Sequence, residues 1–577
     1  MKREGTIRDI GSFCRSLFSH GFIALVICGF SVPMLEATEY YVAVGHPNAS
    51  DSNNGLSLDQ PFKTLGRAVQ GLRPGITLII KAGIYREVLS LSTDGTADNP
   101  IVVRAYPGDE GNVVIRGSDV IKGWTNDGGG VWSVPWQPLP LIDYPDTWID
   151  YGEYSRRREM VFVDGDPFDQ VLSQAELVSG HFWMDDFAQR IRIHYSGDPN
   201  ASQVEISARN QGVYARGRSY QEIRGLRVEH VTTDVFIAAM ALGFHQRVED
   251  CRVEYNNGVG IAAGSDSVIM RTSSNHNGRV GFSLSGSNSS LVSNETSYNS
   301  WRYGPRWDAG GIKIVGGMPS GNRIKQHSAN FNNGRGIWFD TTGSGNLVEA
   351  SVTEGNLIGG LVFEATIGPN WVINSVVVGT VKANDGLSPD FDGAGIAMTA
   401  ASDTLIYNNT IVDVSGAGIQ IGGADRRDHL FQAKNTQVFN NIIVNPGSSA
   451  IRFKVWSDGA TEERLASHEF DNNLYFDAVP TIIFKGAENT WSLAEWQENR
   501  GEDLNSLYAS PIFANPASRD YALLAGSPAV DSGRNLPEVT KDFSGASRPE
   551  GLRTDIGAFE SSTPAIPRRP SSRRLNP

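Results

Sequence analysis

Two acidic residues, Asp340 and Glu364, end closely similar phrases that are 24 residues apart. The phrases are GIWFD at 336–340 and GLVFE at 360–364, so each acid follows a glycine by four positions. If the chain forms coils of that length, the carboxylates share one face on neighbouring strands, which lie about 4.8 Å apart. Two carboxyl groups about 5–5.5 Å apart are the arrangement for glycosidic bond cleavage with retention of configuration. The pair is therefore the first candidate for a catalytic centre.

Polar and aromatic side chains near the acids extend this candidate site. Lys313 lies one repeat before Asp340 and could hold a nucleophilic carboxylate ionised. Trp338 falls on the same predicted face and could stack on a sugar ring. Asp308 lies near the mouth of the proposed site and could bond a sugar hydroxyl or help proton transfer.

The segment 301–308 (WRYGPRWD) interleaves aromatic residues with arginines. This composition suits a sugar-binding wall, and it equally suits a loop that packs its own aromatics. On the first interpretation, the candidate substrate-binding residues of the segment are Tyr303, Arg306 and Trp307.

The acids belong to a repeat that runs through the middle of the chain. Equivalent glycines recur after steps of 21, 30, 25, 24, 35 and 23 residues, at Gly260, Gly281, Gly311, Gly336, Gly360, Gly395 and Gly418. Periods of this size indicate a repeat architecture, and the alternation of apolar and polar residues between the glycines indicates strands. We therefore predict an all-β protein built on a right-handed parallel β-helix, a solenoid whose stacked coils bury a continuous core.

The repeat also predicts which side chains face the core. The first and third residues after each glycine should point inward, as Ile337 and Phe339 do, and the second and fourth outward, as Trp338 and Asp340 do. Asparagine and glycine at fixed offsets are expected to supply left-handed turns between strands. The long steps of 30 and 35 residues predict loops that project from the coil.

Changes of pattern divide the chain into regions. An apolar stretch, Phe22–Leu35, follows Lys2 and Arg3 and predicts a signal peptide over residues 1–37, with a retained anchor as the alternative. Residues 38–118 should form an N-terminal cap and first coils, with an amphipathic capping helix near Leu65. An aromatic-rich stretch at 119–207 predicts an inserted small β-sandwich. The remaining regions are the coil with the active site at 208–480, C-terminal coils or a cap at 481–560, and a disordered tail at 561–577.

Composition narrows the partners and the compartment. The net charge of −14 argues against nucleic acid as a partner, because DNA and RNA are recognised by basic surfaces. Signal cleavage would give a secreted or periplasmic protein without an integral membrane segment. Cys251 would then be the only cysteine, and its position predicts a buried structural thiol. The sequence indicates no oligomeric state.

Taken in order, these features resemble the parallel β-helix β-xylosidases of glycoside hydrolase family 120. The resemblance covers most of residues 40–480 and is carried by WDAGGIK at 307–313, GIWFD at 336–340 and VFE at 362–364. It implies that Asp340 is the nucleophile, Glu364 the acid/base and Asp308 a contact of the reacting sugar.

The sequence thus predicts a retaining glycoside hydrolase that acts on plant or algal saccharides and needs no metal or organic cofactor. A polysaccharide lyase or uronate epimerase on the same coil is the enzymatic alternative, for which Lys313, Arg306 and Arg335 could serve. A carbohydrate-binding or adhesion solenoid without catalysis is the second alternative.

Overall fold

The computed structural model describes residues 38–142, 152–234, 236–383, 391, 393–423, 425–427, 429–454, 465–477, 483–486 and 489–561. All of these lie in one compact unit. The predictions of a signal peptide over 1–37 and of a disordered tail therefore fall outside the described residues, apart from Ser561.

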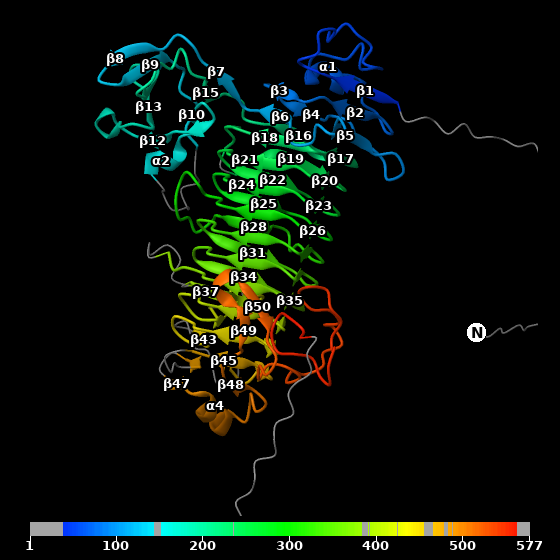
Figure 1. The fold of residues 1–577 in the computed structure, drawn as a ribbon, viewed down its shortest axis with the longest axis vertical. Helices are drawn as coiled ribbons and strands as arrows, with labels where there is room; N and C mark the ends of the chain where they lie inside the picture. The colour runs from blue at the N-terminus through cyan, green and yellow to red at the C-terminus, as the bar shows by residue number, and fades with distance from the viewer. Residues whose placement is uncertain are drawn as a thin grey trace, which may run out of the picture. The chain divides into compact units, whose positions relative to one another are not determined.

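The compact unit is built on three sheets of 13 strands each, and nearly all neighbouring strands in these sheets run parallel (Figure 1). Sheet 1 contains β1 (Glu39–Val42), β2 (Thr77–Ile80), β5 (Ile101–Ala105), β17 (Gln221–Arg224), β20 (Arg247–Glu249), β23 (Val268–Met270), β26 (Ser290–Val292), β29 (Arg323–Lys325), β32 (Leu347–Glu349), β35 (Asn370–Ile373), β38 (Thr404–Tyr407), β41 (Gln437–Phe439) and β44 (Glu469–Asp471). Sheet 2 contains β4 (Leu89–Ser90), β16 (Val213–Ser219), β19 (Ala238–Phe244), β22 (Val259–Ala263), β25 (Val280–Leu284), β28 (Gly310–Val315), β31 (Arg335–Thr342), β34 (Gly359–Thr366), β37 (Ala394–Ala401), β40 (Ile419–Gly422), β43 (Ile451–Lys454), β46 (Phe484–Lys485) and β47 (Thr490–Trp491). Sheet 3 contains β3 (Gly83–Tyr85), β6 (Val113–Arg116), β18 (Leu226–Glu229), β21 (Arg252–Glu254), β24 (Ser273–Asn275), β27 (Glu295–Ser297), β30 (Ser328–Asn330), β33 (Val352–Glu354), β36 (Val376–Val378), β39 (Thr410–Val412), β42 (Ile442–Val444), β45 (Leu474–Phe476) and β48 (Leu507–Tyr508). Successive coils contribute one strand to each sheet, which confirms the predicted parallel β-helix.

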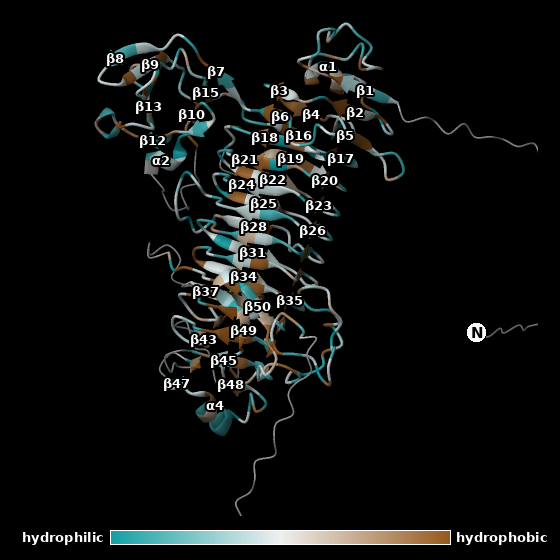
Figure 2. Ribbon diagram, in the orientation of Figure 1, coloured by the Kyte–Doolittle hydropathy of each residue, from teal (hydrophilic) through white to brown (hydrophobic). Residues whose placement is uncertain are grey.

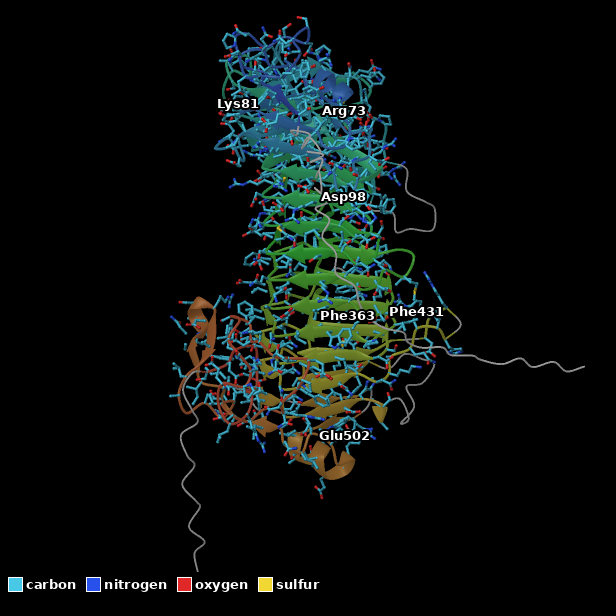
Figure 3. All side chains as sticks on the ribbon, turned by 90° about the vertical axis from the view of Figure 1, so that its right-hand side faces the viewer. Arg73, Lys81, Asp98, Phe363, Phe431 and Glu502 are labelled. Carbon is cyan, nitrogen blue, oxygen red and sulfur yellow. The ribbon has the colours of Figure 1, made fainter. Side chains whose placement is uncertain are left out.

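The interior of the coil follows the predicted alternation. Ile337, Phe339, Leu361 and Phe363 are at most 1% exposed and belong to one continuous core. The rings of Phe339 and Phe363 stack 4.7 Å apart, as expected for equivalent positions in neighbouring coils. The strands of the coil carry both hydrophobic and hydrophilic segments in Figure 2, and Figure 3 labels Phe363 on the stacked strands. Cys251 is buried and unpaired within this core, as predicted.

The repeated glycines are required by close packing between coils. Gly336 and its equivalents are not left-handed, since none of them has a positive φ. They allow close packing instead. A Cβ on Gly336 would lie 2.5 Å from the carbonyl oxygen of Gly360, and a Cβ on Gly360 would lie 2.6 Å from that of Gly395. The glycines thus form a column in which each coil leaves no room for a methyl group.

Asparagine side chains form a ladder along the turns between sheets 3 and 2. In each coil the side-chain amide nitrogen of one asparagine donates to the side-chain oxygen of the asparagine in the next coil, at 2.8–3.1 Å. The ladder begins at Asn256, continues through Asn277, Asn299 and Asn332, and ends at Asn356. The left-handed backbone position is the residue before the asparagine, at Tyr255, His276, Tyr298 and Phe331. Glycine takes this conformation, as expected, only before Asn356, at Gly355, so the expectation is wrong for the other four coils of this ladder. The buried amides instead fix the register between coils.

An inserted β-sandwich interrupts the coil between β6 and β16, as predicted. One sheet contains β7 (Ser118–Val120), β10 (Val161–Val163), β11 (Asp166–Pro167) and β15 (Val204–Ser207). The other contains β8 (Thr125–Gly128), β9 (Val131–Pro135), β12 (Asp169–Val171), β13 (His181–Asp185) and β14 (Arg190–His194). The two sheets share a core that includes Trp124, Phe182 and Ile206. The short helices α2 (Gly152–Arg156) and η2 (Gln174–Glu176) also belong to this part.

Both ends of the coil core are covered. At the N-terminal end, the predicted capping helix is short, with α1 (Leu65–Ala68) continuing into η1 (Val69–Gly71). At the other end, α4 (Leu493–Arg500) buries Trp496 against Phe484, with ring centroids 4.1 Å apart. Helix α4 was not predicted, although Ser492 and Glu495 form a capping box that marks its start.

The C-terminal segment packs on the outside of sheet 3. It contains β49 (Phe513–Asn515), η3 (Pro516–Ser518) and β50 (Asp520–Leu523). Tyr521 and Ile556 share a buried cluster with Val412 and Leu474 of the sheet. Within the described residues, no helix is both long enough and apolar enough to cross a bilayer.

Candidate active site

The structure places the two acids directly opposite one another. Asp340 on β31 pairs in register with Glu364 on β34. Neighbouring strands lie about 4.8 Å apart, so the carboxylates project from adjacent positions of one face. Their side chains are 20% and 13% exposed, which leaves both accessible from solvent.

Asp340 is held by a buried lysine and a neighbouring hydroxyl. The ammonium nitrogen of Lys313, on β28, lies 3.0 Å from Asp340 Oδ2. Thr341 Oγ1 donates a hydrogen bond of 3.0 Å to Asp340 Oδ1. Burial lowers the pKa of Lys313 to about 8, although the charge of Asp340 acts in the opposite direction. At neutral pH most molecules therefore hold an ammonium group against Asp340.

Glu364 is oriented by two donors. Trp338 Nε1 donates to Glu364 Oε2 at 3.1 Å, and Arg426 Nη1 donates to Oε1 at 2.6 Å. Arg426 was missed in the sequence because it lies 62 residues after Glu364, outside the repeated phrases. Its segment is anchored by Phe431, which is buried against Ala365 beside Glu364 (Figure 3).

Trp338 does not form the sugar-stacking platform that the sequence predicted. It points outward from the coil as expected, but it is only 1% exposed because a second layer covers this part of sheet 2. Its neighbours in that layer include Val362 and Phe391. The Lys313 ammonium lies 3.4 Å from the centroid of the Trp338 ring. Trp338 therefore positions Lys313 and Glu364 from beneath the site.

Asp308 and Arg306 are also buried, which corrects their predicted contacts with substrate. Both are 0% exposed. Arg306 Nε lies 2.9 Å from Asp308 Oδ1, and Arg279 Nε lies 3.0 Å from Oδ2. Burial alone would raise the pKa of Asp308, but the two guanidinium groups outweigh it and hold that pKa well below the usual range. Asp308 is therefore a fixed anion that organises arginines and does not transfer protons.

The aromatic residues of the 301–308 segment are divided between two roles. The Tyr303 hydroxyl bonds Asn257 and donates at 3.2 Å to the carbonyl of Arg157 in the inserted part, so it joins the insertion to the coil. Tyr303 is half-buried, and its predicted contact with sugar stays a prediction. Trp307 is half-buried, and its ring lies 6.4 Å from that of Trp338, so it remains a candidate for the rim of the site.

Comparisons with known proteins agree with the fold. The family described as a right handed beta helix region matches residues 189–377. A structure of XylC in complex with xylose superposes with a TM-score of 0.65 at 16% identity, covering 91% of this chain and 99% of XylC. Pectate lyase Pel9A gives a TM-score of 0.42 at 15% identity, covering 90% of this chain and 96% of Pel9A.

Among curated sequences, the uncharacterized protein YwoF of Bacillus subtilis (strain 168) is 36% identical over 104 residues. That alignment covers 17% of this chain and only 21% of YwoF. The fold and the comparisons define the class of protein as a right-handed parallel β-helix protein, similar in fold to XylC. The chemistry rests on the geometry of the site.

Proposed function

We propose that this protein is a secreted or periplasmic retaining glycoside hydrolase that acts on plant or algal saccharides and resembles a β-xylosidase. The observation that carries the proposal is the register of Asp340 opposite Glu364. The strand spacing of about 4.8 Å is close to the carboxyl separation of retaining enzymes and too small for inverting ones, which need about 6.5–9.5 Å. The fold similarity to xylose-bound XylC supports xylosides as the first substrates to test.

The proposed reaction has two steps. A carboxylate oxygen of Asp340 bonds to the anomeric carbon while the glycosidic bond breaks, and Glu364 gives its proton to the departing oxygen. Glu364 then removes a proton from water, whose oxygen displaces Asp340 and releases the sugar. Lys313 orients Asp340 through its ion pair, and Trp338 and Arg426 orient Glu364.

Hydrolysis of aryl glycosides by variants tests this assignment. Asp340→Ala should lower kcat on the order of 10⁴-fold, since it removes the nucleophile. Glu364→Ala should keep bond cleavage for good leaving groups but should stall at the covalent intermediate, from which azide releases a glycosyl azide. Glu349→Ala is the matched control, because Glu349 sits on sheet 1 and pairs with Lys325. Full activity in both site variants would place catalysis elsewhere.

A lyase is a second candidate because Lys313 has the properties of a base. All three candidate bases are buried, but Arg306 and Arg335 are arginines, which stay charged, whereas the pKa of Lys313 is lowered to about 8 by burial. A neutral Lys313 could remove the proton at C5 of a uronate, with formation of a C4–C5 double bond and departure of the O4 oxygen, which takes a proton from Glu364. Appearance of the unsaturated-uronate absorbance would select this reaction over hydrolysis. Sugar binding that survives loss of both acids, without turnover, would select a non-catalytic solenoid.

A further inference from the structure

A cavity of about 360 Å³ opens on sheet 2 several coils before the catalytic pair. Its walls come from β16, β19, β22 and the segment around Phe236, and Arg158 of the inserted part contributes to its rim. The volume lies within the range of about 300–1,000 Å³ that is usual for small-ligand sites. The inserted β-sandwich and the coil therefore both contribute residues to the lining of this cavity.

A column of equivalent positions connects this cavity with the catalytic centre. Tyr214 of the cavity pairs in register with Ala241, which is followed by Ala262, Ser283 and then Lys313. Only small side chains lie between Tyr214 and Lys313 in this column, so they would not block a ligand that lies across these strands. Four strand steps separate β19 from β31, a distance of about 19 Å. A saccharide of several units can span this distance, whereas a single sugar cannot.

The side chains of the cavity suit carbohydrate. Half-buried Tyr214 and Phe236 offer aromatic surface, which packs against the apolar face of a sugar ring. Arg216 is exposed and Asp234 is half-buried, and both can bond hydroxyl groups. Arg158 is fixed in place because its Nη2 donates to the carbonyl of Thr232 at 2.7 Å.

The part of the cavity wall that contains Phe236 is rigid. The guanidinium carbon of Arg279 lies 4.3 Å from the centroid of the Phe236 ring. The same guanidinium lies 3.0 Å from Asp308, which Arg306 holds from the other side. Buried Asp308 therefore couples the wall of the cavity to the strand that carries Lys313. This arrangement gives Asp308 a positioning role at a distance from the reacting sugar.

We propose that this cavity is a distal subsite that binds glycosyl units of a linear oligosaccharide, remote from the bond that is cleaved. The proposal rests on the proposed hydrolase function and makes chains of several units the preferred substrates. It also gives the inserted sandwich a role, since Arg158 supplies part of the rim.

The test compares substrates of increasing length. kcat/KM is measured for an aryl xyloside and for linear β-xylo-oligosaccharides from disaccharide to hexasaccharide, with wild type, Tyr214→Ala and Arg216→Ala. The wild type should gain at least about tenfold in kcat/KM between the shortest and longest chains, which corresponds to roughly 1.4 kcal/mol. Tyr214→Ala should remove most of that gain, and Arg216→Ala part of it. Tyr106→Ala is the control, because Tyr106 is half-buried at the N-terminal end of the coil and contacts Lys81.

Arg216→Ala keeps the test informative if Tyr214→Ala fails to fold, because Arg216 is exposed. A wild-type kcat/KM that is independent of chain length, with aryl xyloside turnover intact, would overturn the subsite and leave the hydrolase proposal standing. If no glycoside is cleaved, the affinity of each variant for the hexasaccharide, measured by calorimetry, still tests the proposed subsite. Weaker binding by Tyr214→Ala and Arg216→Ala would support the proposed subsite, and equal binding by all variants would overturn it.

Discussion

Lys313 should set the alkaline limit of the proposed hydrolysis for aryl glycosides whose leaving group departs without the proton of Glu364. Its ammonium is buried at 3.0 Å from Asp340 Oδ2, and burial lowers its pKa to about 8. A group with this pKa is about nine-tenths protonated at pH 7 and about one-tenth protonated at pH 9. Because loss of the proton removes the charge that orients Asp340, kcat/KM for an aryl glycoside should fall about tenfold across that interval.

Lys313→Arg tests this reasoning, because an arginine stays charged throughout the accessible pH range. The variant should lose the alkaline limb, at a lower overall rate because the planar guanidinium fills the lysine's space differently. Lys325→Arg is the control, since Lys325 is exposed and forms an equivalent ion pair with Glu349 at 3.2 Å. A limb that persists in Lys313→Arg would refute the assignment. Activity on a polyuronate that rises through pH 8 would instead identify neutral Lys313 as the base of a lyase.

The same pKa predicts a stability effect with a definite sign. The folded-state pKa of about 8 lies below the ordinary value of 10.5, so between these pH values the unfolded chain binds more protons. The free energy of unfolding should therefore rise with pH across this window, by about 3 kcal/mol from this residue. Chemical denaturation of Lys313→Met should lack that rise.

Two further predictions concern the support of the site. Trp338→Phe keeps a buried ring but removes the 3.1 Å hydrogen bond to Glu364, so kcat should fall about tenfold or more while KM stays within about twofold. A rise in KM alone, measured by steady-state kinetics, would return Trp338 to a sugar-binding role. Gly336→Ala should lower the thermal midpoint strongly or prevent soluble expression, because its Cβ would lie 2.5 Å from a carbonyl oxygen of the next coil. Gly45→Ala is its control, since a Cβ there meets nothing within 4 Å, and equal midpoints for the two variants would contradict the close-packing argument.

The parts of the fold that depend on short-range pattern could be predicted from the sequence. The repeated glycines revealed the period, and the alternation after each glycine fixed which residues face the core. This was enough to place Asp340 opposite Glu364, because a parallel coil pairs equivalent positions. The β-sandwich was also predictable, since its aromatic-rich strands interrupt the period.

The parts that depend on contacts between distant segments could not be predicted. Trp338 faces outward as the pattern requires, yet Phe391 and its neighbours cover it from a segment that has no repeat. Arg426 reaches Glu364 from a segment 62 residues further on. Asp308 has the sequence position of a substrate contact, but two arginines enclose it. In each case alternation gives the direction of a side chain but not what lies above it.

The asparagine ladder affects the deamidation of the protein, which is the loss of side-chain amides from asparagine. Asn277 precedes Gly278, and asparagines are thermally labile residues that can lose their amide to become aspartate. In the folded coil Asn277 is 0% exposed, and its side-chain amide donates to Asn299 and accepts from Asn256, which restrains its orientation. A chain damaged while unfolded would have to bury a carboxylate in this ladder, at a cost of several kcal/mol. Deamidation should therefore be slow in the native protein, and a chain that is deamidated at Asn277 while unfolded should refold poorly.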